Sequence, residues 1–138
     1  MLVKKQWLKV TILGVFLTAL LMGTLMIAPA AHASGGDDVR IRLRGSAQYP
    51  NAKGSAKYKD EGGEQEFEVE LENARALKGT TVRVFANGQQ VGTMRVSRLG
   101  RASLNLNSDR GQAVPNIHAG SSVQIKTSSG VLIVSGSF

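Results

Sequence analysis

Apolar residues recur at every second position along much of the chain from Val39 onward. The alternating apolar residues are Val39, Ile41 and Leu43, then Phe67, Val69 and Leu71, then Ala102, Leu104 and Leu106, and finally Val123 and Ile125. A period of two is that of a β-strand with one face buried and the other in water. The pattern therefore predicts half-buried strands rather than helices.

Turn-forming residues separate these runs. They are Glu61-Gly62-Gly63, Asn87-Gly88, Leu99-Gly100 and Ser128-Ser129-Gly130. The Asn87-Gly88 pair is the strongest hairpin signal, because a type I′ turn needs a positive φ at both of its central residues.

We predict eight short strands and one helical turn. The strands lie near residues 38–45, 54–60, 65–72, 80–86, 89–96, 101–107, 121–127 and 131–137, and the helical turn lies at 74–78. Short strands at regular spacing, joined by glycine-rich turns, indicate a β-sandwich or barrel. The predicted fold is all-β, an eight-stranded antiparallel Greek-key β-sandwich over residues 39–138.

The first 33 residues differ in kind from the rest. Three lysines within the first nine positions precede an apolar stretch at residues 10–28, and Ala31 and Ala33 are the small residues of a signal-cleavage site. We predict an N-terminal signal helix cleaved after Ala33, a flexible lead at 34–38 and a periplasmic or secreted domain. Because about 20 apolar residues span a bilayer, an uncleaved membrane anchor at 10–28 is the alternative.

Composition changes this picture in two ways. The chain has 138 residues and no Cys, which excludes disulfides, thiol chemistry, Cys-ligated zinc and a lipid anchor on an N-terminal Cys. Residues 34–138 hold 14 of the 17 basic residues and all 10 acidic ones, a net charge of +4. Seven of those acids lie between Asp60 and Glu72, a window without Lys or Arg, so the rest of the domain is strongly basic.

The first predicted strand carries a row of arginines on one face. This arginine stripe consists of Arg40, Arg42 and Arg44. Guanidinium groups pair bidentately with phosphate and carboxylate, so the stripe is a candidate binding face for an anionic surface polymer or another envelope protein. Two structural alternatives are cross-strand ion pairs with the glutamates of 66–72 and protection of a sheet edge against aggregation. If the first three strands form a meander, those glutamates face Lys57 and Lys59 and the stripe stays uncompensated.

The connection at 107–120 is long for a compact all-β domain, and long loops often carry binding function. Its candidate binding residues are Asp109, Arg110 and His118. His118 is the only His of the domain and no Gly-x-Ser-x-Gly motif accompanies it, so we expect no catalytic residues. The run from Asn105 to Gly111 lacks the spacing of an EF-hand calcium loop, and we expect no metal and no cofactor. An enzymatic or metal-binding use of this loop is the alternative function. In a structural alternative its apolar members close one end of the sandwich; these are Val114, Pro115 and Ile117.

Aromatic residues are few in the domain. Phe67, Phe85 and Phe138 lie in strand patterns and are expected in the core, which leaves only Tyr49 and Tyr58 to stack on bases. Nucleic acid is therefore not an expected partner, and membrane contact is expected only through an uncleaved N-terminal segment.

The segment from Phe67 to Gly92 resembles a known kind of domain. It reads Phe67-Glu-Val-Glu-Leu71, Leu77-Lys78-Gly79, Thr81-Val-Arg-Val-Phe85, Asn87-Gly88 and Val91-Gly92. This is similar to small secreted bacterial β-sandwich domains of the chordin-repeat (CHRD)-like kind and distantly to the superoxide-dismutase Greek key. The resemblance implies a sandwich scaffold, Ig-like or superoxide-dismutase-like, without a known activity. The dismutase site needs several His, and only His118 is present in the domain, so its metal chemistry is not implied.

Overall fold

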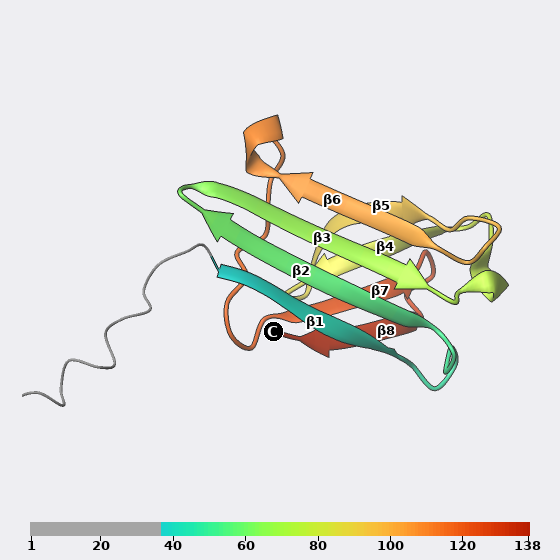
Figure 1. Cartoon of the computed structure of the whole chain (residues 1–138). Coiled ribbons are helices and arrows are strands. Elements are labelled where there is room, and N and C mark those ends of the chain that lie inside the picture. Colours follow the sequence, from blue (N-terminus) through green and yellow to red (C-terminus); the bar gives the residue numbers. More distant parts are fainter. Residues whose placement is uncertain (1–36) are drawn as a thin grey trace, which may run out of the picture. The chain divides into compact units, whose positions relative to one another are not determined.

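Each run of alternating residues forms a strand, and all paired strands are antiparallel (Figure 1). The structure is a computed structural model that describes residues 37–138. Its strands are β1 (Asp37–Gly45), β2 (Lys53–Glu61), β3 (Glu64–Glu72), β4 (Thr81–Ala86), β5 (Gln89–Arg95), β6 (Ala102–Asn107), β7 (Ser122–Thr127) and β8 (Leu132–Ser137). The eight predicted strands are confirmed.

Helical structure within 37–138 is limited to two short 3₁₀ helices, η2 (Arg75–Leu77) and η3 (Ser108–Arg110). The helical turn predicted at 74–78 is confirmed by η2. No helix in the described part of the chain is long and apolar enough to cross a membrane. The predicted signal helix, its cleavage residues Ala31 and Ala33, and the start of the lead lie outside the described residues, and β1 begins within the predicted lead.

The eight strands form one sheet in the order β5-β4-β7-β8-β1-β2-β3-β6, which curls until its end strands lie side by side. A Cβ atom added to Gly92 in β5 would lie 2.6 Å from a terminal methyl carbon of Leu104 in β6. Among the described residues no backbone ladder joins β5 to β6, and β8 pairs with β1 only where Ser135 and Val134 meet the last two residues of β1. The sheet is thus nearly closed and barrel-like. Within residues 37–138 it is unpaired between β5 and β6 and only briefly paired between β1 and β8.

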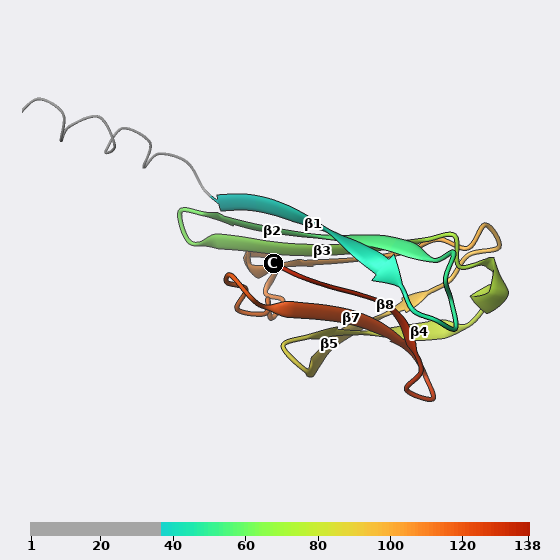
Figure 2. The same ribbon diagram turned by 90° about the horizontal axis from the view of Figure 1, so that it is seen from below.

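The inward faces of the strands share one apolar core. Figure 2 shows β1, β2 and β3 in one layer and β4, β5, β7 and β8 in the layer facing it. The largest fully buried side chains are Phe67, Leu71, Ile125, Ile133, Val69, Val82, Val84, Val96, Val123 and Val134. The core position predicted for Phe67 is confirmed, and Phe138 is half-buried against this core.

The core position predicted for Phe85 is wrong. Val82, Val84 and Ala86 of β4 face inward, so strict alternation places Phe85 on the outer face of the sheet. There Arg83 and Lys126 lie over its ring, with the guanidinium carbon 5.6 Å and the Lys126 Nζ 4.9 Å from the ring centroid. Cation–π contacts and the stems of the two long side chains cover the ring in place of the core.

The connections alternate between the two ends of the sheet. One end holds the connections at 46–52, 73–80, 96–101 and 128–131; the other holds the start of β1, the turns after β2 and β4, and the long connection at 108–121. In the turn after β4, Asn87 has φ 50° and Gly88 has φ 79°, so the positive φ values predicted for this pair are confirmed.

Tyr58 of β2 is buried, and its ionisation couples the stability of the fold to alkaline pH. Burial raises the pKa of Tyr58 above its ordinary value of 10.0, and the nearby Asp60 carboxylate raises it further. The unfolded chain therefore ionises this phenol at lower pH than the folded protein does. We expect stability to be constant with respect to Tyr58 below about pH 10 and to fall as pH rises beyond it. Melting temperatures measured above that pH should fall less steeply for Tyr58→Phe; equal slopes would contradict this account.

Candidate functional site

The arginine stripe lies on the outer face of β1, and all three of its side chains are exposed. β1 pairs with β2 along almost its whole length, so each arginine has a defined cross-strand neighbour. Arg40 lies opposite Lys57, Arg42 opposite Ser55 and Arg44 opposite Lys53. Two of the three arginines therefore face another cation directly, an arrangement that destabilises a sheet.

The glutamates of β3 lie one strand further away. β2 pairs with β3 so that Lys53, Lys57 and Lys59 lie opposite Glu72, Glu68 and Glu66. The first three strands form a meander, which is the arrangement predicted to leave the arginine stripe without glutamates directly opposite it. Because β2 stands between β1 and β3, the two rows are about 10 Å apart, and the register excludes direct cross-strand pairs between the stripe and the glutamates.

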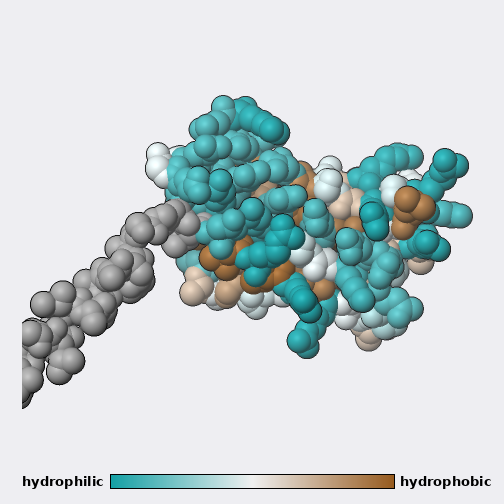
Figure 3. All heavy atoms as spheres, in the orientation of Figure 1, coloured by the Kyte–Doolittle hydropathy of each residue, from teal (hydrophilic) through white to brown (hydrophobic). Residues whose placement is uncertain are grey.

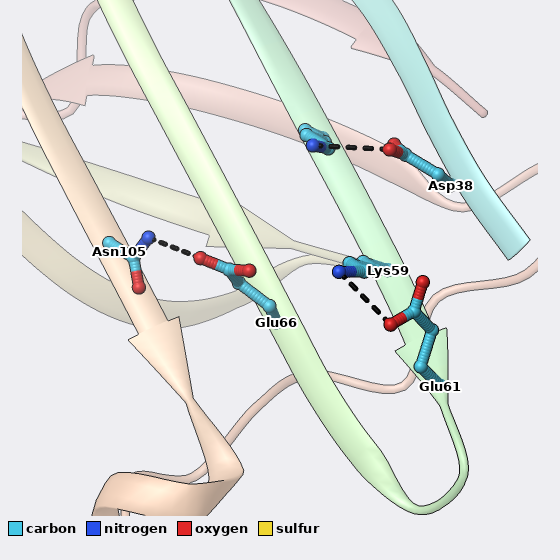
Figure 4. Close-up of polar contacts among 6 residues, drawn as sticks. Asp38, Lys59, Glu61, Glu66 and Asn105 are labelled. Atoms are coloured by element: carbon cyan, nitrogen blue, oxygen red, sulfur yellow. Dashed lines mark hydrogen bonds and ion pairs between the residues drawn. The ribbon is translucent and has the colours of Figure 1, made fainter. Parts of the chain in front are cut away.

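Among the described residues, the ion pairs on this face are formed by lysines of β2 and not by the arginines of the stripe. Lys57 Nζ lies 3.2 Å from Asp38 Oδ2, and Lys59 Nζ lies 3.1 Å from Glu61 Oε2 (Figure 4). The hydrogen bond and charge of Glu61 raise the pKa of Lys59. Within residues 37–138 neither of these pairs, nor any other, involves an arginine of the stripe. The three guanidinium groups therefore remain available to an external anion.

β6 completes this face with neutral groups. Asn105 Nδ2 donates to Glu66 Oε1 at 2.6 Å, and Asn107 Nδ2 donates to Glu64 Oε1 at 3.1 Å. On the β2 side, Ser55 Oγ donates to Glu70 Oε2 at 3.4 Å. The outer face thus changes along the sheet from arginine on β1, through lysine on β2 and glutamate on β3, to amide and hydroxyl groups on β6. Glu66 and Glu70 are held by hydrogen bonds from β6 and β2, and the arginines lie at the β1 side of this face.

An open groove of about 990 Å³ follows β1 and β2. Its lining includes the whole stripe together with Lys53 and Ser55, and it reaches Glu70 and Glu72 on its far side. Alternate residues of a strand are about 7 Å apart, so the stripe presents three guanidinium groups over about 14 Å. This spacing suits a linear chain of repeated anionic groups better than one small anion.

No protein-family description, curated protein or solved structure matches the chain.

The residues predicted as candidates in the long loop do not gather into one site. The backbone N–H of Asp109 donates to Asn107 Oδ1 at 2.7 Å, and Arg110 is exposed at the end of η3. The ring Nδ1 of His118 lies 3.0 Å from the carbonyl oxygen of Ala119. No hydrogen bond or ion pair connects these three side chains in the described structure, and no group of three His, Cys, Asp or Glu there is placed to hold a metal ion.

The long loop closes one end of the barrel-like sheet. Ile117 is buried in the core, and Val114 packs against it. Asn87 Nδ2 donates to the carbonyl oxygen of Asn116 at 3.1 Å, and the backbone N–H of His118 donates to Ser121 Oγ at 3.0 Å. Of the three apolar residues predicted to close this end, Ile117 and Val114 pack in the core as predicted, and Pro115 is half-buried.

Two lysines beside the arginine stripe were not predicted as site residues. Lys53 and Lys57 lie opposite Arg44 and Arg40. Lys53 extends the positive charge onto β2, whereas Asp38 compensates the charge of Lys57. The alternation of both lysines with Ser55 is visible in the sequence, but their place beside the stripe depends on the register of the hairpin. The geometry of the connection at 46–52 sets that register.

Proposed function

We propose that this protein is an exported, non-enzymatic binding module of the cell envelope that holds an anionic surface polymer along the arginine stripe. The observation that carries the proposal is the exposed row of three arginines flanked by Lys53 and Lys57, with no carboxylate paired to any arginine of the row among residues 37–138. Placing like charges opposite one another costs stability. A bound polyanion would offset that cost.

Phosphate or carboxylate groups are the proposed ligand chemistry. A guanidinium group donates two parallel hydrogen bonds to either anion and keeps its charge at every physiological pH. Lys53 adds a point charge that tolerates varied geometry, whereas Lys57 is already paired with Asp38. An envelope protein with a row of surface carboxylates is the other partner that this chemistry would accept.

Export is part of the proposal. The lysines at the start of the chain, the apolar stretch at 10–28, and Ala31 and Ala33 support a cleaved signal peptide. With cleavage the domain would work in the periplasm or outside the cell; without it, residues 10–28 would anchor the domain to the membrane.

We propose that the scaffold is a Greek-key β-sandwich. When β6 is counted as the neighbour of β5, strands β4, β5 and β6 are consecutive and β7 lies beside β4, which is the Greek-key order. The weak pairing between β1 and β8 supports two sheets of four strands. We also propose that this scaffold is similar in fold to CHRD-like and superoxide-dismutase-like domains. The proposed similarity covers the fold and no activity.

Replacing the three arginines of the stripe by Ser is expected to weaken retention on columns of immobilised polyphosphate and alginate at low salt. The substitutions remove three charge-assisted contacts, each worth about 1.5–3 kcal/mol when desolvated and less when exposed. We expect the R40S/R42S/R44S variant to elute at clearly lower salt than the unsubstituted domain. Salt of elution on both columns is the measurement.

A variant of equal charge controls for net charge. Replacing Arg75, Lys78 and Arg98 by Ser also removes three positive charges, but from the connections at the end of the sheet. This variant should elute close to the unsubstituted domain. Equal shifts for both variants would show that the arginine stripe contributes to retention only through the net charge of the domain. Unchanged retention of the stripe variant together with lower solubility would assign the arginines to edge protection.

A further inference from the structure

We propose that the end of the domain formed by the connections at 73–80 and 96–101 docks on an anionic lipid surface, with Leu99 inserted among the acyl chains. This surface is separate from the arginine stripe, and the inference does not depend on the proposed polymer binding. It rests on the joining of the two connections, on their charge and on the exposure of Leu99.

Backbone hydrogen bonds join the two connections into one unit. The N–H of Ala74 donates to the carbonyl oxygen of Gly100 at 3.0 Å, and that of Gly79 donates to Val96 at 2.8 Å. The N–H of Val96 donates in turn to the carbonyl oxygen of Thr80 at 2.9 Å. The side chains of both connections are therefore presented together on one surface.

This surface is basic. Its exposed cations are Arg75, Lys78, Arg95, Arg98 and Arg101. Neither connection contains an acidic residue, and in the described structure none of the five cations forms an ion pair. Glu70 and Glu72 share a hollow of about 410 Å³ with Arg95 and Arg101, so Arg75, Lys78 and Arg98 are the least compensated members.

Leu99 lies at the tip of the 96–101 connection with 65% of its surface exposed. Among residues 37–138 the only other exposed large apolar side chain is Val39, at 44%. Figure 3 shows brown apolar atoms surrounded by teal polar ones at the end of the domain where these connections lie. Exposing Leu99 to water costs free energy that burial in a partner would recover.

The combination of charge and shape favours lipid over the other anionic partners. Leu99 is exposed at the tip of its connection. The hollow beside that connection is lined by Glu70 and Glu72, which would repel an acidic peptide or polymer. A membrane interface accepts an apolar side chain below the headgroups while anionic headgroups attract the surrounding cations. Each cation near such a surface strengthens binding by about fivefold, and an inserted leucine adds about tenfold.

The test uses residues 34–138, which contain every strand and the whole core, once a cooperative thermal transition has shown that the segment is folded. Trp7 is the one tryptophan of the chain, so Leu99→Trp introduces the only indole of this segment. We expect its fluorescence to shift to the blue with vesicles of phosphatidylcholine and phosphatidylglycerol and to stay unchanged with phosphatidylcholine alone. Val39→Trp, at the other exposed apolar site, should show no shift.

Two variants of equal net charge then separate the two surfaces. In vesicle co-sedimentation, replacing Arg75, Lys78 and Arg98 by Ser should weaken binding about 100-fold, and R40S/R42S/R44S should change it little. No blue shift at residue 99, an equal shift at residue 39, or equal losses for the two variants would overturn the proposal. If the unsubstituted domain did not bind vesicles and the Arg75, Lys78 and Arg98 variant lost retention on polyphosphate, the surface around Leu99 would bind a polymer instead. Each result leaves the stripe to be judged by its own column test.

Discussion

Replacing Phe67 with Ala is expected to lower the free energy of unfolding by about 3–5 kcal/mol. The side chain is fully buried at 0% exposure between Tyr58 of β2 and Leu106 of β6. Its removal loses the transfer free energy of the ring and leaves a cavity in a core that the surrounding strands cannot fill. Denaturant unfolding of residues 34–138 measures the effect as a lower midpoint at constant slope.

Leu99→Ala provides the comparison for this substitution. Leu99 is largely exposed, and we expect its replacement to change the unfolding free energy by no more than about 0.5 kcal/mol. A small effect at Phe67 would mean that the layers of the sheet do not pack on this residue, and the described core would be incorrect.

Replacing Gly100 with Ala is expected to lower the free energy of unfolding by about 2–5 kcal/mol. Its φ of 77° costs an L-residue about 1–2 kcal/mol, and overpacking adds about 1–3 kcal/mol. A Cβ at this position would lie 2.5 Å from the backbone nitrogen of Arg75, which cannot rotate away as a side chain can. Unfolding of the variant by denaturant gives the measurement.

Gly111 is the matched control for Gly100. Its φ of 75° is nearly the same, but a Cβ there would meet nothing within 4 Å. Gly111→Ala should therefore cost only the conformational part, about 1–2 kcal/mol. Equal losses at the two glycines would show that the connections at 73–80 and 96–101 are not packed together, which would also weaken the membrane proposal.

The strands could be predicted because their inward positions are apolar and their outward positions are polar with a period of two. β4 shows where this signal is ambiguous. Phe85 is apolar but lies in the outward phase, and three smaller inward residues, Val82, Val84 and Ala86, determine which face is buried. The ring is covered by Lys126 of β7, a contact between strands that the local sequence does not reveal.

Only the part of the candidate site that lies on β1 could be predicted from the sequence. The spacing of the arginines places them on one face, but the addition of Lys53 and Lys57 depends on the register of β1 with β2. The basic surface around Leu99 could not be predicted, because it depends on backbone hydrogen bonds between the connection that carries Arg75 and the connection that carries Arg98. Membrane contact was expected only from the N-terminal segment, whereas the proposed docking surface is built by folding.

The most direct test of the arginine stripe is the salt dependence of the dissociation constant for polyphosphate, measured for the unsubstituted domain and for R40S/R42S/R44S. Each neutralised phosphate of a single-stranded polyanion contributes about 0.7 to the slope of log K against log salt. If all three arginines contact the polymer, the substitutions should reduce the magnitude of that slope by about 2. An unchanged slope would show that the polymer binds elsewhere on the domain and would contradict the proposed function.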